Sequence, residues 1–436
     1  MARILHREAD RRSALDRALG LFAAVEPGEG RMALLLALDV FLVLTAYYVL
    51  KVVREPLILT SGAFGLRGAE LKAAAAGAQA LLLLGAIPLY GKVAARFLGA
   101  RLLNAVSGFF IACLIGFAVL AQAGVAIGPA FFVWLGIFNM MAVAQLWSFA
   151  ADVYTPAQGE RLFAIVAFGG TAGAVVGSAV AGWLIARLEP SSILIVAAIV
   201  LALAMALTAV IGKLAPVRAP AKRERRGGFG LVLGRPYLTL VALVVLVFST
   251  VNTNGEYILG STVIEHARAL FPGDTGAQQR MVGGFYGGFF TVQNILTALL
   301  QLFVVGRIMA RYGVRATLLV LPALSLVGTS LLAAAPVLAV VRVFKVLENA
   351  TDYSLHNTAR HALFLPVAVD EKYQAKAAID TFFVRFGDLA SFGLVAATAA
   401  LGLGVRTVAV LNLGLVVVWG LLALRAGRRY QEISQA

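Results

Sequence analysis

The sequence is poor in cysteine and in charged residues. Cys113 is the one cysteine among 436 residues, so disulfides and cysteine-based metal sites within one chain are excluded. Charged residues make up 14% of the chain and hydrophobic residues 61%. A soluble domain is about half apolar and about a quarter charged. A soluble core cannot accommodate this excess of apolar residues.

Short enzyme motifs are also missing. The chain has no GxxxxGK[ST] phosphate loop, no HExxH zinc motif and no GxSxG nucleophile elbow. His356 and His361 lack an obvious third ligand, so we expect no metal site. We therefore expect no enzyme activity, no catalytic residues, no cofactor and no ATP-driven pumping by this chain alone.

Long apolar stretches are what the sequence does contain. Stretches of 18 or more residues recur from Met32 to Leu424, each long enough to cross about 30 Å of hydrocarbon. They predict twelve spans, near residues 31–53, 72–95, 101–122, 128–152, 161–186, 191–212, 237–264, 280–306, 314–335, 338–364, 374–401 and 405–425. Spans 3, 6, 9 and 12 are nearly free of charge, so we expect spans 1, 4, 7 and 10 to line a cavity.

The net charge of +15 comes from basic loops and does not indicate nucleic acid binding. Alternate loops are basic, including those after spans 2, 6 and 8, whereas residues 124–128 and 333–337 on the opposite side carry no charge. The N-terminal segment lacks the apolar core of a secretory signal. The positive-inside bias therefore places both termini in the cytoplasm.

The midpoint of the chain carries a basic connector, residues 213–228, with six basic residues and one glutamate. A flexible tether is favoured over a lipid-binding segment. The predicted organisation is a cytoplasmic amphipathic segment, a six-helix bundle, a basic linker, a second six-helix bundle and a cytoplasmic tail, at residues 1–30, 31–212, 213–236, 237–425 and 426–436.

The two halves show an internal repeat. A shift of 215 residues places the loop at 91–101 on that at 306–315, and Arg161 at the start of span 5 on Lys376 at the start of span 11. Tight cytoplasmic turns also collect glycine and arginine by chance. We predict an all-α integral membrane protein of 12 transmembrane helices, in two pseudo-repeat bundles of six, as in the major facilitator fold.

Span 10 is the most charged span. Its charged and histidine residues follow at intervals of three or four within a 120° arc, namely Arg342, Lys345, Glu348, Asp352, His356 and Arg360. A dry ladder of ion pairs between helices is one interpretation. A hydrated path is favoured, because a dry ladder would bear a desolvation cost that apolar packing avoids.

Three other spans carry polar residues. Span 7 has Asn252, Asn254, Glu256 and Tyr257 around Gly255, where a helix break would let them cradle a substrate. Helix packing is the alternative, and Glu256 alone could carry a proton. Span 1 ends with Lys51, Arg54 and Glu55, which we expect at the outer mouth, where such side chains can snorkel to water. Span 11 offers Lys376–Asp380 and Arg385–Asp388 as ion pairs.

These positions, with Lys72 at the start of span 2, contain a small excess of positive charge. Eight are basic and six acidic: Lys51, Arg54, Lys72, Arg342, Lys345, Arg360, Lys376 and Arg385 against Glu55, Glu256, Glu348, Asp352, Asp380 and Asp388. Fixed cations offset the desolvation of an anion, so the excess favours an anionic substrate.

Five segments resemble the ATP/ADP translocase family of plastids and intracellular bacteria. They are YYVLKVVREPLILTSG (47–62), AELK (69–72), LWSFAADVYTPAQGERLFAIVAFGGTAGAVVGS (146–178), NTNGEYILGSTVIE (252–265) and DYSLHNTARHALFLPVAVDEKYQAKAAID (352–380). The resemblance implies a major-facilitator-like fold in a bacterial inner membrane. It also implies exchange of ATP for ADP or uptake of nucleotides, with Lys72, Glu256 and Lys376 contacting phosphates and coupling the exchange.

The chain departs from the family pattern in two places. KVVREP stands where a charged pair such as RDTKD is expected, and AAD at 150–152 replaces the usual AND. Two other functions stay open. One is a proton-coupled facilitator of a non-nucleotide solute, with Glu256 or Asp352 as the carrier. The other is a scaffold or regulatory subunit that does not transport.

Overall fold

The computed structural model describes residues 13–20, 23–94, 99–215, 228–334 and 337–435. Within them the chain is nearly all helical, with one antiparallel hairpin of β1 (Gly62–Ala63) and β2 (Leu66–Arg67). The N-terminal half contains α2 (Ala14–Leu19), α3 (Gly30–Leu59), α4 (Ala69–Ala94), α5 (Gly99–Gln122), α6 (Gly128–Phe138), the π-helix η1 (Asn139–Val143), α7 (Ala144–Val153), α8 (Pro156–Ile185) and α9 (Pro190–Leu214).

The C-terminal half contains three further π-helices. Its elements are α10 (Gly228–Gly234), α11 (Pro236–Leu270), α12 (Thr275–Leu300), η2 (Gln301–Val305), α13 (Gly306–Ala334), α14 (Leu338–Thr351), η3 (Asp352–His356), α15 (Asn357–Ala362), α16 (Val369–Ala378), η4 (Ile379–Phe383), α17 (Val384–Ala400) and α18 (Val405–Gln435). Parts of the predicted N-terminal segment (1–12, 21–22), of the first repeat loop (95–98) and of the basic linker (216–227) lie outside the described residues.

Nine helices of the described chain are long and apolar enough to cross a membrane. One of them, residues 275–334, contains both predicted spans 8 and 9. Predicted spans 2 and 10 fall on α4 and on α14 to α15, which are not among the nine. The chain is thus a multi-pass membrane protein, while the count of twelve and the pseudo-repeat stay predictions.

Small residues bring the first and fifth predicted spans together. Gly169, Gly173 and Gly177 recur every fourth residue on α8, and an added Cβ would lie 2.2, 2.4 and 2.5 Å from carbonyl oxygens of α3. Such spacing lets two helix backbones approach closely in a membrane. Pro156 and a capping box between Thr155 and Gln158 start α8.

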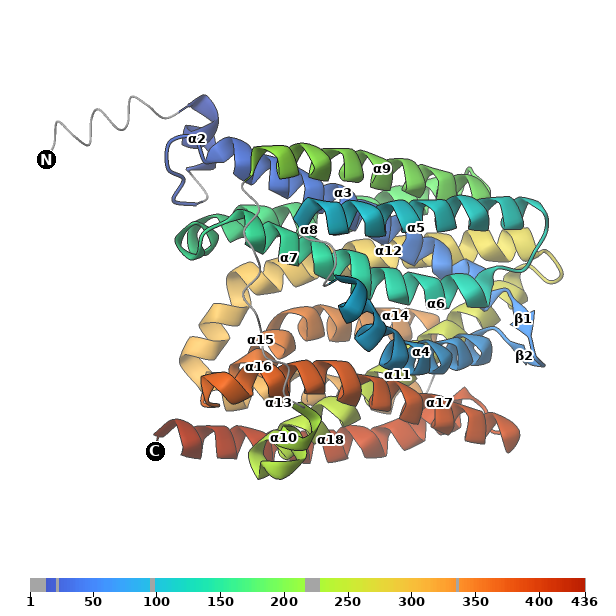
Figure 1. Cartoon of the computed structure of the whole chain (residues 1–436). Coiled ribbons are helices and arrows are strands. Elements are labelled where there is room, and N and C mark those ends of the chain that lie inside the picture. Colours follow the sequence, from blue (N-terminus) through green and yellow to red (C-terminus); the bar gives the residue numbers. More distant parts are fainter. Residues whose placement is uncertain (1–12, 21–22, 95–98, 216–227, 335–336, 436) are drawn as a thin grey trace, which may run out of the picture.

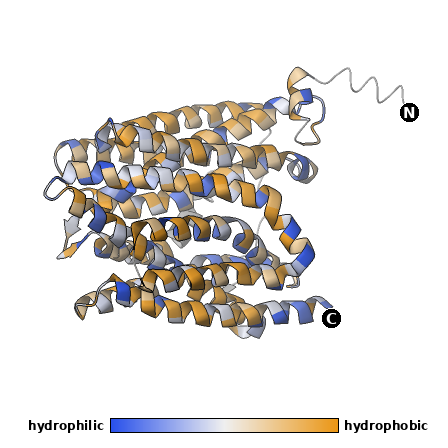
Figure 2. Cartoon of the chain, turned by 180° about the vertical axis from the view of Figure 1, so that it is seen from behind, coloured by the Kyte–Doolittle hydropathy of each residue, from blue (hydrophilic) through white to orange (hydrophobic). Residues whose placement is uncertain are grey.

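The outer surface of the bundle is apolar. Phe168 and Leu302 are more than 70% exposed, which suits side chains that face lipid. Figure 2 shows hydrophobic residues along most of the helices and hydrophilic ones near the helix ends, such as the last turns of α18. The described end of the chain at α18 and the segment around α2 lie at the same end of the bundle, opposite the β1–β2 hairpin (Figure 1). We call these the termini end and the hairpin end.

The two halves meet along two helix pairs, in which α8 packs on α12 and α4 on α17 (Figure 1). An added Cβ on Gly287 of α12 would lie 2.6 Å from the Cα of Gly182 in α8. Thr291 donates to Ser178 at 3.1 Å, and Gln279 donates to Thr60 at 3.1 Å nearer the hairpin. The halves therefore touch in the middle of the bundle and toward the hairpin end.

Candidate functional site

A cavity of about 480 Å³ lies between the two halves. It includes residues from the four spans expected to line it (α3, α6 with η1, α11 and α14 to α15), and also from α4, α12 and α17. Its size is in the ordinary range for small-molecule sites. Eight charged residues line it: Lys51, Arg54, Lys72, Arg360, Arg385, Glu256, Asp352 and Asp388.

Glu55 lies just behind this cavity and holds two cations. Its carboxylate accepts from Lys72 Nζ at 2.7 Å and from Arg54 Nε at 3.0 Å, and its side chain is 1% exposed. At the expected outer mouth, Glu55 is therefore buried between Arg54 and Lys72. Its partner Lys72 lies on α4, 17 residues further along the chain, so the pairing joins two different helices. The ion pair is buried.

Glu256 connects the two halves. Its carboxylate lies 3.8 Å from Lys72 of the N-terminal half and 3.7 Å from Lys345 of α14. Asn349 also donates to it, at 3.3 Å. The predicted helix break at Gly255 does not occur, because α11 is continuous from Pro236 to Leu270. Instead Gly255 makes room for Lys345, whose Nζ would lie 2.9 Å from an added Cβ.

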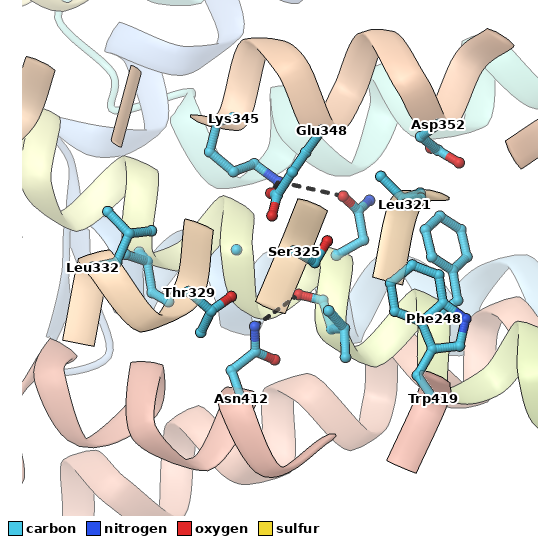
Figure 3. Close-up of a pocket in the computed structure, with 14 residues that line it drawn as sticks. Phe248, Leu321, Ser325, Thr329, Leu332, Lys345, Glu348, Asp352, Asn412 and Trp419 are labelled. Carbon is cyan, nitrogen blue, oxygen red and sulfur yellow. Dashed lines mark hydrogen bonds and ion pairs between the residues drawn. The ribbon is translucent and has the colours of Figure 1, made fainter. Parts of the chain in front are cut away.

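A second, small pocket lies deeper in the C-terminal half (Figure 3). Lys345 Nζ pairs there with Glu348 at 3.3 Å and donates to Asn252 at 3.4 Å. The pocket has a volume of about 20 Å³, and Ser325 and Thr329 of α13 also line it. That is room for about one water molecule. Lys345 therefore connects this pocket with Glu256 at the main cavity.

The charged and histidine residues of span 10 lie in different surroundings. The π-helix η3 interrupts the helix at Asp352–His356, and a π-turn holds more residues than an α-turn. Asp352 lines both pockets and Arg360 the main cavity. His356 is 1% exposed and packs between the rings of Phe248 and Trp419, at centroid distances of 4.7 and 5.5 Å. Arg342 lies 5.4 Å from the ring of Phe285.

Span 11 matches its prediction in part. The predicted pair Arg385–Asp388 forms at 2.7 Å, and Asp388 also accepts from Thr253 of α11 at 2.9 Å. Asp380 lies in η4 and pairs with Arg360 at 3.9 Å instead of with Lys376. Neither Lys376 nor Asp380 lines the cavity. Lys72 and Glu256 are thus brought together, whereas Lys376 is not brought to the cavity wall with them.

The polar residues of span 7 divide between two roles. Asn252 and Tyr257 line the cavity. Asn254 is buried, donates to Asn412 of α18 at 3.0 Å and accepts from Ser391 of α17 at 2.7 Å. The helix-packing interpretation therefore fits Asn254.

Lys51 has an aromatic environment. Its Nζ lies 4.4 Å from the ring centre of Phe290, 5.1 Å from Tyr48 and 5.9 Å from Tyr353. With the described residues it forms no ion pair within 4.0 Å. A cation that faces a cavity beside aromatic rings is available to an anion.

The sequence did not predict the uncharged polar residues that line the cavity. Gln79, Asn139 and Asn349 line the cavity beside the rings of Tyr47 and Phe132. Their signal in the sequence is an isolated amide inside an apolar span, which is weaker than a charge. Among the described residues no group of three or more His, Cys, Asp or Glu side chains is placed to hold a metal ion.

Known proteins similar to this chain are transporters. The family model described as TLC ATP/ADP transporter matches residues 315–430. ADP,ATP carrier protein 1 of Chlamydia trachomatis serovar D is 24% identical over 243 residues, covering 50% of this chain and 44% of the carrier. The protein of the same name from Chlamydia pneumoniae is 22% identical over 251 residues, covering 50% and 47%. The aligned region is therefore less than half of either relative.

Solved structures with the same fold cover nearly the whole chain. The nucleoside transporter NupG aligns with a TM-score of 0.64 at 14% identity, over 91% of this chain and 98% of that one. An inward-facing, unoccupied bacterial homologue of the human lysosomal transporter Spinster aligns with a TM-score of 0.61 at 15% identity, over 93% and 98%. The resemblance to the ATP/ADP translocase family predicted from the sequence is thereby confirmed, on a transporter fold of the major-facilitator type.

Proposed function

We propose that this protein is a secondary transporter that moves a nucleotide, or a related phosphorylated anion, by alternating access between its two halves. The observation that carries the proposal is the charge of the main cavity. Five cationic and three carboxylate residues line it, from both halves. Fixed cations replace part of the hydration that a phosphate loses on leaving water. The matched relatives are ADP,ATP carriers, which supports a nucleotide as the substrate.

The ion pairs suggest how a substrate would be coupled to the movement. Lys72 is shared between Glu55 in its own half and Glu256 in the other. A phosphate that approaches Lys51 and Lys72 competes with Glu256 for the same cation. Binding would weaken the link between the halves, and release would restore it. An empty carrier then keeps the link, which favours exchange over net loss of substrate.

Transport by purified protein tests the proposal. Proteoliposomes loaded with ADP should take up labelled ATP, and Lys51→Gln should lower this uptake at least tenfold. Arg311→Gln is the matched control, because Arg311 lies over the ring of Tyr312 and outside the cavity. Absence of uptake of any nucleotide by folded wild-type protein would refute the proposal.

The relative importance of two lysines is a second test. Lys72→Gln should abolish exchange, because Lys72 lines the cavity. Lys376 does not line it, so Lys376→Ala should lower exchange only if a rearrangement during transport brings Lys376 to the cavity. The family resemblance implies a large effect at both positions. Full ATP uptake by Lys72→Gln would show that Lys72 is not part of the substrate site.

The two alternative functions have separate readouts. Proton coupling of a non-nucleotide solute requires uptake that responds to an imposed pH gradient and is lost in Glu256→Gln. A scaffold requires a dry interior, so cysteines placed singly at Asp352 and His356 should both resist water-soluble thiol reagents. A transport cavity predicts reaction at Asp352 and protection at His356, since only Asp352 lines the cavity.

A further inference from the structure

A third pocket, of about 220 Å³, lies between the two halves. Val53 and Pro56 in the last turns of α3 form one side, and the turn from α8 to α9, residues 185–190, forms another. The first turns of α12, from the C-terminal half, complete the wall. Because β1 follows α3 closely, the last turns of α3 place the pocket at the hairpin end of the bundle (Figure 1). We call it the hairpin-end pocket.

Two arginines, one from each half, line the hairpin-end pocket. Arg187 follows the end of α8, and Arg280 lies in the second turn of α12. Neither forms an ion pair within 4.0 Å with the described residues. Arg187 donates to the carbonyl of Trp183 at 3.0 Å, and the guanidinium of Arg280 makes no hydrogen bond within the described chain. Most donors of the two guanidinium groups are therefore free to bind an anion.

The other groups around the pocket leave it positive. Glu189 is the one acidic side chain in its described lining, so two arginines against one glutamate leave a net charge of +1. Gly276 and Pro190 also line it, in the first turns of α12 and α9, respectively. The N-terminus of a helix carries a partial positive charge. The side chains and the helix ends therefore both favour an anion.

The surface beside the pocket faces lipid. Trp183 is 57% exposed, and the guanidinium of Arg187 lies 4.3 Å from its ring centre. Tryptophan and arginine both suit the boundary between hydrocarbon and headgroups. Val176 and Val180 are exposed on the same face of α8, so an apolar strip leads along this helix to the pocket. The pocket is smaller than the usual site of a whole small molecule, so it has room for a headgroup while the acyl chains stay in the bilayer.

We propose that the hairpin-end pocket binds the phosphate of an anionic phospholipid through Arg187 and Arg280, with the acyl chains along the exposed face of α8. The apolar strip favours a lipid over a soluble phosphate, and the net positive charge favours an anionic headgroup over a zwitterionic one. Because one arginine comes from each half, the lipid would join the halves at an end where they already touch. The site is independent of the transported substrate, since the pocket and the main cavity share no residue within the described chain.

Native mass spectrometry of the full chain, released from nanodiscs of phosphatidylcholine with added phosphatidylglycerol, tests the proposal. Wild-type protein should retain phosphatidylglycerol in preference to phosphatidylcholine. Arg187→Gln and Arg280→Gln should each weaken this retention about tenfold, because each removes a charge-assisted hydrogen bond. Glu189→Gln removes the opposing carboxylate and should strengthen retention, a gain that misfolding cannot produce. Arg67→Gln is the matched control, because Arg67 is exposed on β2 at the same end and does not line the pocket.

Equal retention of phosphatidylglycerol by wild type, Arg187→Gln and Arg280→Gln would overturn the lipid site. Equal retention of phosphatidylglycerol and phosphatidylcholine by the wild type would overturn it as well. Glycerol phosphate in solution is the competitor that lacks acyl chains, and it should not release the lipid at an equal concentration. Release would identify a site for soluble phosphate and overturn the assignment to lipid. The proposed transport would stand in each case, because ATP uptake by proteoliposomes is measured separately.

Discussion

Replacing Glu55 by glutamine should cost much more folding stability than the same change at Glu256. Glu55 is 1% exposed and holds Arg54 and Lys72, whose side chains are 16% and 7% exposed. Removing one partner of a buried pair costs about 3–5 kcal/mol, because the other charge stays buried without compensation. Lys72 keeps Glu256 at 3.8 Å, so we expect a loss near the lower limit, about 3 kcal/mol.

Glu256 is in a different position. Its side chain is 26% exposed, its two contacts are 3.7 and 3.8 Å long, and each lysine keeps another carboxylate, Glu55 or Glu348. Exposed pairs contribute about 1 kcal/mol or less, so Glu256→Gln should cost no more than that. Its effect should fall on transport, because it removes the link between the halves.

Unfolding in mixed micelles with increasing sodium dodecyl sulfate measures these free energies, followed by the fluorescence of the four tryptophans. Glu265→Gln is the matched control, because Glu265 lies exposed on the same helix as Glu256 and should change the free energy by less than about 0.5 kcal/mol. Equal losses for Glu55→Gln and Glu256→Gln, or a larger loss for Glu256→Gln, would refute the reasoning about burial.

Three further predictions concern single positions. Gly287→Val should separate α8 from α12, since its Cβ would lie 2.6 Å from the facing backbone, and spin-label distances between these helices should lengthen; unchanged distances would contradict the close packing. Gly255→Ala should displace Lys345 Nζ and slow ATP uptake, with a stability loss of about 1 kcal/mol or less; normal uptake would show that the contact is unimportant. A hydrogen bond from the Gly28 amide, foremost, holds the pKa of Asp16 at about 2, below its usual 3.8, so its contribution to holding the N-terminal segment is present above pH 4 and lost as the pH falls toward 2. Cleavage of the segment by pepsin, divided by pepsin's rate on an unstructured peptide at the same pH, should rise over that range in wild type and stay constant in Asp16→Asn.

Length and hydropathy predict most of the membrane helices, because a span must satisfy its own backbone hydrogen bonds in lipid. Hydropathy predicts a membrane helix less well where the helix carries polar residues that serve the site. Span 10 is not among the helices that are long and apolar enough to cross a membrane, yet it forms α14, η3 and α15 in the position expected. Its neighbours supply the partners, such as Asn252 for Lys345, that make its charges tolerable.

The site could be predicted as a set of residues but not as a geometry. Charges in apolar spans identified Lys72, Glu256 and Lys345, which do meet. The pairing of Glu55 with Lys72 depends on how α3 packs on α4 after the hairpin, which no local spacing contains. His356 was expected on a hydrated path, whereas it is buried against Phe248 and Trp419, and no local spacing predicts those tertiary contacts.

The π-helices give the cavity wall a property that regular helices lack. Three of them, η1, η3 and η4, lie in helices that contribute residues to the cavity. Deleting one residue from Asp352–His356 would restore α-helical winding there and leave α15 and Arg360 in place, because a π-turn takes up one extra residue. Each π-turn is a place where a single residue can be taken up or given back. One end of a membrane-crossing helix can therefore gain or lose a residue at its π-turn without disturbing the other end.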